Sequence, residues 1–371
     1  MARRLPERLL SSRPALALKR VAGGRFPGAY DRLRRGYHGA RRAMKEPPAA
    51  RLGDDRLFWD PPPRTLPLRP NRPGEVTETL FARLDAGDLV EIERRLRGDD
   101  AAFWAGLSKD ERKWVALPFG VHYGVQSVMD KTGLTADMPP TDWGGGNIGP
   151  LAAGGSSFYA DQLADPLREA GLPLCSGQRV LDFGGSTGRA VRVLAAAYPD
   201  IEWHCCDPER AAIEWAREHL PGIHFFVSDP DPPLPCDDGA YDVVSAQGVF
   251  SHFSEDAART WFAELGRVLK PGGALVFSTH GLQSVQMHAG EWGGWDRRRI
   301  AEVATELYTS GFKFVGAYGK EGHHSLASPR WGEAFMTAEW VLQTLTPAWR
   351  ILHFEAGYVE GNFDLYVAQR R

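Results

Sequence analysis

The spacing of apolar residues divides the chain near residue 175. Between residues 74 and 97, apolar side chains recur every three to five positions, which is the spacing of amphipathic helices. Residues 99–117 predict a further helix pair, in which Ser108 and Glu111 form a capping-box pattern and indicate the start of a helix. We therefore expect a mostly helical N-terminal domain over residues 75–175.

Beyond residue 175, short apolar runs alternate with helical patterns. Five of these runs are expected to be strands: 178–183, 202–207, 223–227, 241–247 and 269–278. Strands that alternate with helices are typical of a parallel sheet. Near the end of the chain, two alternating segments, 349–355 and 363–369, flank a turn that contains glycine. They predict a terminal hairpin.

The first expected strand runs into a glycine-rich turn, and the chain reads R-V-L-D-F-G-G-S-T-G-R from Arg179 to Arg189. Gly184, Gly185 and Gly188 let the backbone approach a ligand, and the helix that follows offers unpaired N–H groups. Asp182 stands two residues before the first glycine. A carboxylate there would repel the pyrophosphate of a dinucleotide and attract an ammonium group.

A second acid ends the second expected strand. Asp207 follows Asp182 by one strand–helix–strand unit, so both acids emerge at the same edge of a parallel sheet. A carboxylate in that place can accept two hydrogen bonds from a ribose diol. Pro208 follows directly and suits the first turn of the next helix.

The order of acid and glycines resembles motif I, (D/E)-x-G-x-G-x-G, of the class I S-adenosylmethionine-dependent methyltransferases. Asp182, Gly184 and Gly188 match the motif, and Ser186 replaces its middle glycine. The run R-V-L-K-P-G-G before an apolar strand is also highly characteristic of this class. The resemblance covers residues 176–280 and 336–371.

The resemblance implies an α/β fold with a seven-stranded Rossmann-like methyltransferase sheet, in the order 3-2-1-4-5-7-6 with strand 7 antiparallel. It also implies S-adenosyl-L-methionine as the cofactor. Asp229, after the third strand, inherits contact with the adenine, and Tyr159, on the helix before the first strand, is a candidate to cover the cofactor. The expected cofactor-binding residues are Tyr159, Asp182, Gly184, Gly185, Ser186, Gly188, Asp207, Pro208, Asp229 and Gln247.

An insertion over residues 281–335 separates the two parts of the resemblance. It is rich in side chains that bind planar or sugar-like faces, and 297–310 within it has a helical pattern. We expect a lid over the carboxyl-terminal edge of the sheet. Its aromatic and histidine residues are His288, Trp292, Trp295, Tyr308, Tyr318, His323, His324 and Trp331.

Methylation of an oxygen calls for a base with a pKa near the working pH, which favours histidine. His252 follows the fourth expected strand and His280 follows the fifth, and both strand ends face the methyl group. His323 and His324 on the lid are further candidates, and the choice stays open. Metal-dependent members of the class carry an Asp/Asp/Asn set that has no counterpart here, so no metal is expected.

Composition adds bounds on location and partners. The chain is 43% hydrophobic and 25% charged, as in globular proteins, and its four cysteines have no Cys-x-x-Cys spacing. We expect reduced cysteines and a cytoplasmic location. Residues 1–45 carry 13 Lys and Arg against two acids, and a proline-rich linker follows to residue 74. This basic arm could touch an anionic surface, and it has no apolar run long enough for a signal peptide or membrane span.

These observations predict three regions: an arm and linker (1–74), a helical domain (75–175) and a methyltransferase domain (176–371). The expected function is methylation of a hydroxyl on a small-molecule or glycan acceptor, with a histidine base. A small-molecule N-methyltransferase and a non-catalytic S-adenosylmethionine-binding module are the alternatives. Nucleic acid is not expected as a partner, because acidic residues outnumber basic ones beyond residue 45 and no N/D-P-P-Y/F motif follows Val244.

Overall fold

The computed structural model describes residues 73–140, 149–290, 295–317, 328–359 and 362–371. The expected basic arm lies outside these residues. So do Trp292, Tyr318, His323 and His324 of the expected lid.

The described residues fall into two compact units. One comprises 81–155, and the other comprises 73–80 together with 156–371. The described helices include none that is both long and apolar enough to cross a bilayer.

The unit formed by residues 81–155 is helical. Ser108 caps α6 while Glu111 bonds back to the Ser108 backbone, which confirms the predicted capping box. Trp104 and Phe119 are buried with ring centroids 6.3 Å apart and form part of the core. The helices are α4 (Ala86–Arg95), α5 (Gly98–Ala105), α6 (Lys109–His122), α7 (Gln126–Thr132) and the 3-10 helix η3 (Pro150–Ala152).

The second unit begins with α3 (Glu75–Phe81), which the buried side chain of Asp161 holds at its start. The backbone N–H groups of Gly74 and Thr77 donate to this carboxylate at 3.0 and 2.9 Å. Asp161 belongs to α8 (Ser157–Glu169), the helix expected before the first strand.

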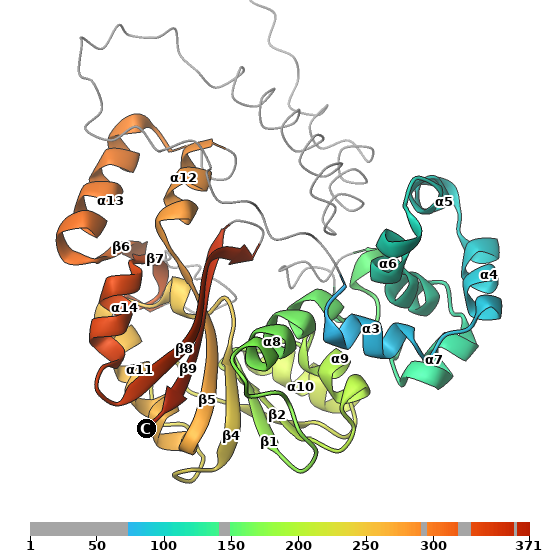
Figure 1. The fold of residues 1–371 in the computed structure, drawn as a ribbon, viewed down its shortest axis with the longest axis horizontal. Coiled ribbons are helices and arrows are strands. Elements are labelled where there is room, and N and C mark those ends of the chain that lie inside the picture. Colours follow the sequence, from blue (N-terminus) through green and yellow to red (C-terminus); the bar gives the residue numbers. More distant parts are fainter. Residues whose placement is uncertain (1–72, 141–148, 291–294, 318–327, 360–361) are drawn as a thin grey trace, which may run out of the picture. The chain divides into compact units, whose positions relative to one another are not determined.

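Five parallel strands lie side by side in the sheet of the second unit (Figure 1), and all five were predicted. Their spatial order is β3-β2-β1-β4-β5. The chain order reverses at β1, and ligands of open α/β sheets bind outside the carboxyl ends of strands at such a point. The strands are β1 (Arg179–Phe183), β2 (Glu202–Asp207), β3 (His224–Val227), β4 (Tyr241–Ala246) and β5 (Leu269–His280).

The end of the chain supplies the reversed strand. β9 (Phe363–Arg370) runs antiparallel to β5, from the pair Ala274↔Gln369 to the pair His280↔Phe363, and β8 (Trp349–Val359) pairs with β9. In the numbering of the methyltransferase class, β9 is the seventh strand and β8 is the sixth. The predicted order, with its antiparallel seventh strand, is therefore confirmed.

The insertion adds two strands to the sheet that were not predicted. β6 and β7 pair antiparallel, and β7 joins β5 through the parallel pair His280↔Phe335. Because β9 occupies one edge of His280, β7 lies on the other edge, beyond the last pair of β4, Ala246↔Phe277. Over the described residues, the sheet thus has nine strands. The inserted elements are α12 (Leu282–Gly290), α13 (Arg297–Ser310), β6 (Phe312–Ala317) and β7 (Gly332–Met336).

The remaining elements connect and cover the strands. Glu209, rather than Pro208, occupies the N-cap of α10, so the proline lies just before the helix and not in its first turn. An isolated antiparallel bridge joins Phe253 to Trp331 and places the start of β7 beside the segment that follows β4. These elements are α9 (Val191–Ala197), α10 (Arg210–His219), η4 (Phe250–His252), α11 (Glu255–Val268) and α14 (Ala338–Leu345).

Candidate active site

The glycine turn after β1 can be built only with minimal side chains. Gly184 has φ +77°, and a Cβ there would lie 2.5 Å from Cγ2 of Val249. Gly188 has φ +73°, and a Cβ would lie 2.9 Å from Cζ of Phe225. Ser186 also has a left-handed backbone, with φ +50°, which L-residues adopt at a cost. This conformation explains why the motif has glycine at the position of Ser186.

The two predicted acids lie beneath and beside this turn. Asp182 is buried, and burial, followed by the charge of Asp207, raises its pKa to about 7. A Cβ on Gly185 would lie 2.6 Å from Oδ2 of Asp182, so the turn packs directly on this carboxyl. Asp207 accepts the N–H of Ser186 at 3.0 Å and the N–H of Glu209 at 2.8 Å. One carboxylate thereby connects the glycine turn to the start of α10.

A cavity at the carboxyl ends of β1 to β4 brings six predicted residues together. Its lining includes Gly184, Ser186, Asp207, Pro208, Asp229 and His252. These residues come from separate segments between 184 and 252, and only the parallel sheet makes them neighbours. The cavity is where the fold is expected to hold a ligand.

Six other predicted residues do not line this cavity: Tyr159, Asp182, Gly185, Gly188, Gln247 and His280. The guanidinium of Arg189 lies 4.5 Å from the ring centroid of Tyr159, and Gln247 donates from Nε2 to the Tyr159 carbonyl at 3.3 Å. These contacts connect α8 to the chain after the glycine turn and to the residue that follows β4. The roles assigned to these six residues stay predictions.

Six lining residues were not predicted as site residues: Phe183, Ser228, Gly248, Val249, Trp261 and Trp331. Trp331 was predicted only as an aromatic residue of the lid. Trp261 lies on α11, and its helical spacing does not distinguish it from a residue of the hydrophobic core. The hydroxyl of Ser228 is buried and has no hydrogen-bond partner among the described residues. The position of Ser228 directly after an expected strand was the feature of the sequence that could have identified it as a site residue.

The two candidate bases occupy different surroundings. His252 lines the cavity, and its Nδ1 lies 3.1 Å from the carbonyl oxygen of Gly332. His280 is buried against the rings of Phe335 and Phe363, with centroids 5.2 and 4.5 Å away. Burial, followed by the nearby histidines, holds the pKa of His280 well below its usual value.

A partly buried pair, His288 and Glu333, connects α12 to β7 within the insertion. Nε2 of His288 on α12 lies 3.2 Å from Oε1 of Glu333 on β7, and its Nδ1 lies 2.7 Å from the carbonyl oxygen of Ser284. Burial alone would lower the pKa of His288, but its contacts with Glu333 and Ser284 raise it. The same pairing lowers the pKa of Glu333.

The residues of this site fit S-adenosylmethionine. Gly184 and Ser186 line the cavity with minimal side chains, so a ligand can approach the backbone there closely. The N–H groups of these two residues are already bonded, to the Cys206 carbonyl and the Asp207 carboxylate. The unpartnered hydroxyl of Ser228 can exchange hydrogen bonds with a polar ligand, and the carboxylate of Asp207, which lines the cavity, favours a cationic one. The same negative charge would repel a pyrophosphate.

Comparison with known proteins agrees with this reading. Residues 180–273 match a family described as Methyltransferase domain. A malonyl-[acyl-carrier protein] O-methyltransferase of Methylococcus capsulatus is 33% identical over 160 residues, which cover 40% of this chain and 55% of that protein. A trans-aconitate 2-methyltransferase of Methylobacterium nodulans is 30% identical over 125 residues, which cover 32% of this chain and 45% of that protein.

The chain spans about half the length of these curated relatives. Among solved structures, an SAM-dependent methyltransferase of Methanosarcina mazei is 20% identical with a TM-score of 0.40, over 53% of this chain and 94% of that one. That likeness is too weak to bear on function. The family match and the strand order together show that the chain carries a class I S-adenosylmethionine-dependent methyltransferase domain, whose cofactor is S-adenosylmethionine.

Proposed function

We propose that the protein methylates a hydroxyl oxygen of a small-molecule or sugar acceptor, with His252 as the general base. The observation that carries this proposal is the place of His252 in the same cavity as the glycine turn and Asp207. The names of two relatives, the malonyl-[acyl-carrier protein] and the demethylspheroidene O-methyltransferases, support oxygen as the acceptor atom.

The hydrogen bond of His252 to Gly332 determines which ring nitrogen can accept a proton. A carbonyl oxygen only accepts, so Nδ1 donates its proton to Gly332, and in the neutral ring the lone pair is on Nε2. The position of Gly332 between the strands admits no side chain, since a Cβ there would lie 1.9 Å from the carbonyl oxygen of Gly316 on β6. The insertion therefore holds the tautomer that a general base requires.

S-adenosylmethionine supplies a methyl group activated by its sulfonium. The chain has to hold the acceptor oxygen in line with that methyl and remove its proton as the new C–O bond forms. Nε2 of His252 takes the proton in this proposal, and the indoles of Trp261 and Trp331 offer apolar faces for the acceptor. His280 fits the role less well, because it does not line the cavity and is enclosed by aromatic rings.

A carboxylate acceptor is the second candidate, and the relatives' names favour it, since malonyl and trans-aconitate are derived from carboxylic acids. A carboxylate is already ionised at neutral pH, so its methylation needs no base. An amine acceptor and binding without turnover also remain to be tested by the same experiment.

The test is an acceptor screen that measures S-adenosylhomocysteine formation by the full chain with alcohols and sugars, carboxylic acids, and amines. With a hydroxyl acceptor, His252→Ala and His252→Gln should lower kcat by roughly 100- to 10,000-fold while binding of S-adenosylhomocysteine is retained. His122→Ala, which removes an exposed histidine of the helical unit, is the control.

Each other outcome has a definite meaning. If His252→Ala kept full activity on a hydroxyl acceptor, the proposal that His252 is the general base would be refuted. Turnover confined to carboxylic acids or amines would refute the acceptor class. Cofactor binding without turnover across the screen would favour the non-catalytic module.

A further inference from the structure

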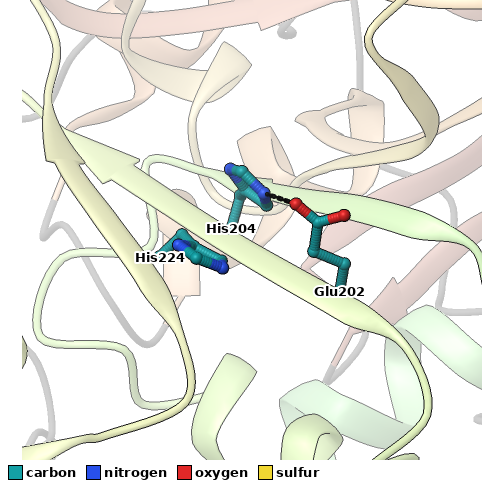
Figure 2. Close-up of side chains that lie close together, drawn as sticks. All are labelled: Glu202, His204 and His224. Atoms are coloured by element: carbon teal, nitrogen blue, oxygen red, sulfur yellow. Dashed lines mark hydrogen bonds and ion pairs between the residues drawn. The ribbon is translucent and has the colours of Figure 1, made fainter.

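Two histidines and one glutamate meet on one face of the sheet, away from the candidate active site. Glu202 and His204 are two residues apart on β2, so they point to the same face. His224 is the first residue of β3 and pairs directly with His204 in the parallel register, which puts its side chain on that face too. Figure 2 shows the three side chains together on the neighbouring strands.

The three side chains are close enough to share an ion. Their potential ligand atoms all lie within 4.8 Å of one another, and Nε2 of His204 is 2.9 Å from Oε1 of Glu202. Ligands about 2.0–2.2 Å from a tetrahedral ion are roughly 3.4 Å apart, so shifts of about 1 Å would complete the site. Glu202 and His224 are exposed, and their side chains have room to make such shifts.

The groups around the cluster already orient two of its members. The hydroxyl of Tyr241 lies 3.3 Å from Nδ1 of His204, and Nε of Arg179 lies 3.0 Å from Oε2 of Glu202. A ligating histidine commonly donates its second ring N–H to such a partner, here the Tyr241 oxygen, while its other nitrogen binds the metal. The arginine leaves Oε1 as the carboxylate oxygen that faces His204.

The donor set selects the kind of ion. Two imidazole nitrogens and one carboxylate oxygen suit zinc and neighbouring transition metals, whereas calcium and magnesium prefer sites made of oxygen. The positive charge of Arg179 further disfavours an ion held mainly by charge.

We propose that Glu202, His204 and His224 bind one divalent transition-metal ion, with zinc as the best fit and water as a fourth ligand. The site is structural in this proposal. It would tie β3, a strand of four residues at the edge of the sheet, to β2. Because Ser228 and Asp229 directly follow β3 and line the cavity, the ion would steady one wall of the candidate active site.

This site is independent of the proposed methyl transfer. No metal was expected from the sequence because the Asp/Asp/Asn set of metal-dependent members is missing, and the proposed site departs from that expectation at a place away from the strand ends. The three residues here come three to five positions before the strand ends, as Glu202 and His204 precede Asp207 and His224 precedes Val227. The site holds or fails whatever the acceptor proves to be.

The experiment is a calorimetric titration of chelator-treated, untagged full chain with zinc chloride, with cobalt(II) absorption as a report on tetrahedral coordination. Wild type should bind one zinc ion with micromolar or tighter affinity and melt at a higher temperature when it is bound. His224→Ala and Glu202→Gln should weaken binding at least about tenfold and abolish the thermal shift. Both replaced side chains are exposed, so the substitutions leave the core intact.

Two control variants locate the binding. His122→Ala removes an exposed histidine outside the sheet and should bind zinc like wild type. His353→Ala disrupts a second cluster, Glu169, His353 and Glu355, and should also bind like wild type. Absence of zinc binding by wild type, unchanged binding by His224→Ala, or loss of binding only in His353→Ala would each overturn the proposal.

Discussion

The carboxylate of Asp207 accepts the backbone N–H of Ser186 at 3.0 Å, which ties the end of β2 to the turn that follows β1. Its other oxygen accepts the N–H of Glu209 at 2.8 Å, directly before α10. A residue predicted to bind the cofactor ribose therefore also shapes the loop around it. Ligand binding and loop geometry should change together when Asp207 is replaced.

Asp207→Ala should weaken binding of S-adenosylhomocysteine roughly 10- to 100-fold, because hydrogen bonds to a charged group contribute about 1.5–3 kcal/mol. Isothermal titration calorimetry measures the change. Asp200→Ala, which removes an exposed acid in the turn before β2, is the matched control and should bind like wild type. Equal affinities in the Asp207 and Asp200 variants would remove Asp207 from the cofactor site.

Ser186→Gly should stabilise the protein by about 0.5–1 kcal/mol. The left-handed backbone costs a serine about 1–2 kcal/mol, and the extra flexibility of glycine in the unfolded chain offsets part of the gain. Affinity for S-adenosylhomocysteine should stay the same, since the bond to Asp207 comes from the backbone. Denaturant unfolding beside calorimetry tests both statements.

Gly184→Ala is the counterpart of this substitution. Its Cβ would meet Val249 at 2.5 Å in a left-handed backbone, so a loss of about 2–4 kcal/mol is expected. Should Gly184→Ala prove as stable as wild type, the close packing of the turn on Val249 would be wrong.

The central strands could be predicted because each has a local signature. Asp182 and Asp207 end apolar runs, so their common edge follows from the parallel connection alone. The hairpin that supplies β9 was likewise visible as two alternating segments around a glycine turn. Patterns of this kind are set by burial on one or both faces and need no knowledge of distant contacts.

The contacts of the insertion could not be predicted in the same way. β7 joins the sheet through the single pair His280↔Phe335, and Trp331 reaches Phe253 across about 80 residues of sequence. The same contacts separate the two histidines, because His252 lies in the cavity lining while β7 and β9 enclose His280. The sequence spacing placed both histidines at strand ends, and it could not show which of the two lies in the cavity.

His288 and Glu333 should stabilise the fold by about 1–2 kcal/mol near pH 6, a modest value because the Glu333 side chain is 36% exposed. The pKa of His288 is raised in the folded protein, so its contribution is complete below the unfolded pKa of about 6.5 and is lost as the pH rises through the folded value. The difference in unfolding free energy between wild type and His288→Gln should shrink from about pH 6 to about pH 9. A difference that does not change with pH would show that the pair is not ionic.

Cofactor binding should report the ionisation of Asp182. Burial and Asp207 raise its folded pKa to about 7, so the carboxyl is largely protonated at pH 6, whereas a cationic ligand favours the ionised form. Affinity for S-adenosylmethionine should therefore fall by up to about tenfold as the pH is lowered from 7.5 to 6, since binding must release the proton from Asp182.

Two variants test this assignment. Asp182→Asn should bind S-adenosylmethionine more weakly than wild type and lose this pH dependence. Asp364→Asn is a demanding control: burial also raises the pKa of Asp364 to about 7, yet this carboxyl lies on β9 against Gly281 and Gly357 and not under the glycine turn, so its replacement should leave the pH dependence of wild type intact. If Asp364→Asn flattened the profile and Asp182→Asn did not, the cation would be recognised elsewhere than at the acid before the glycine turn.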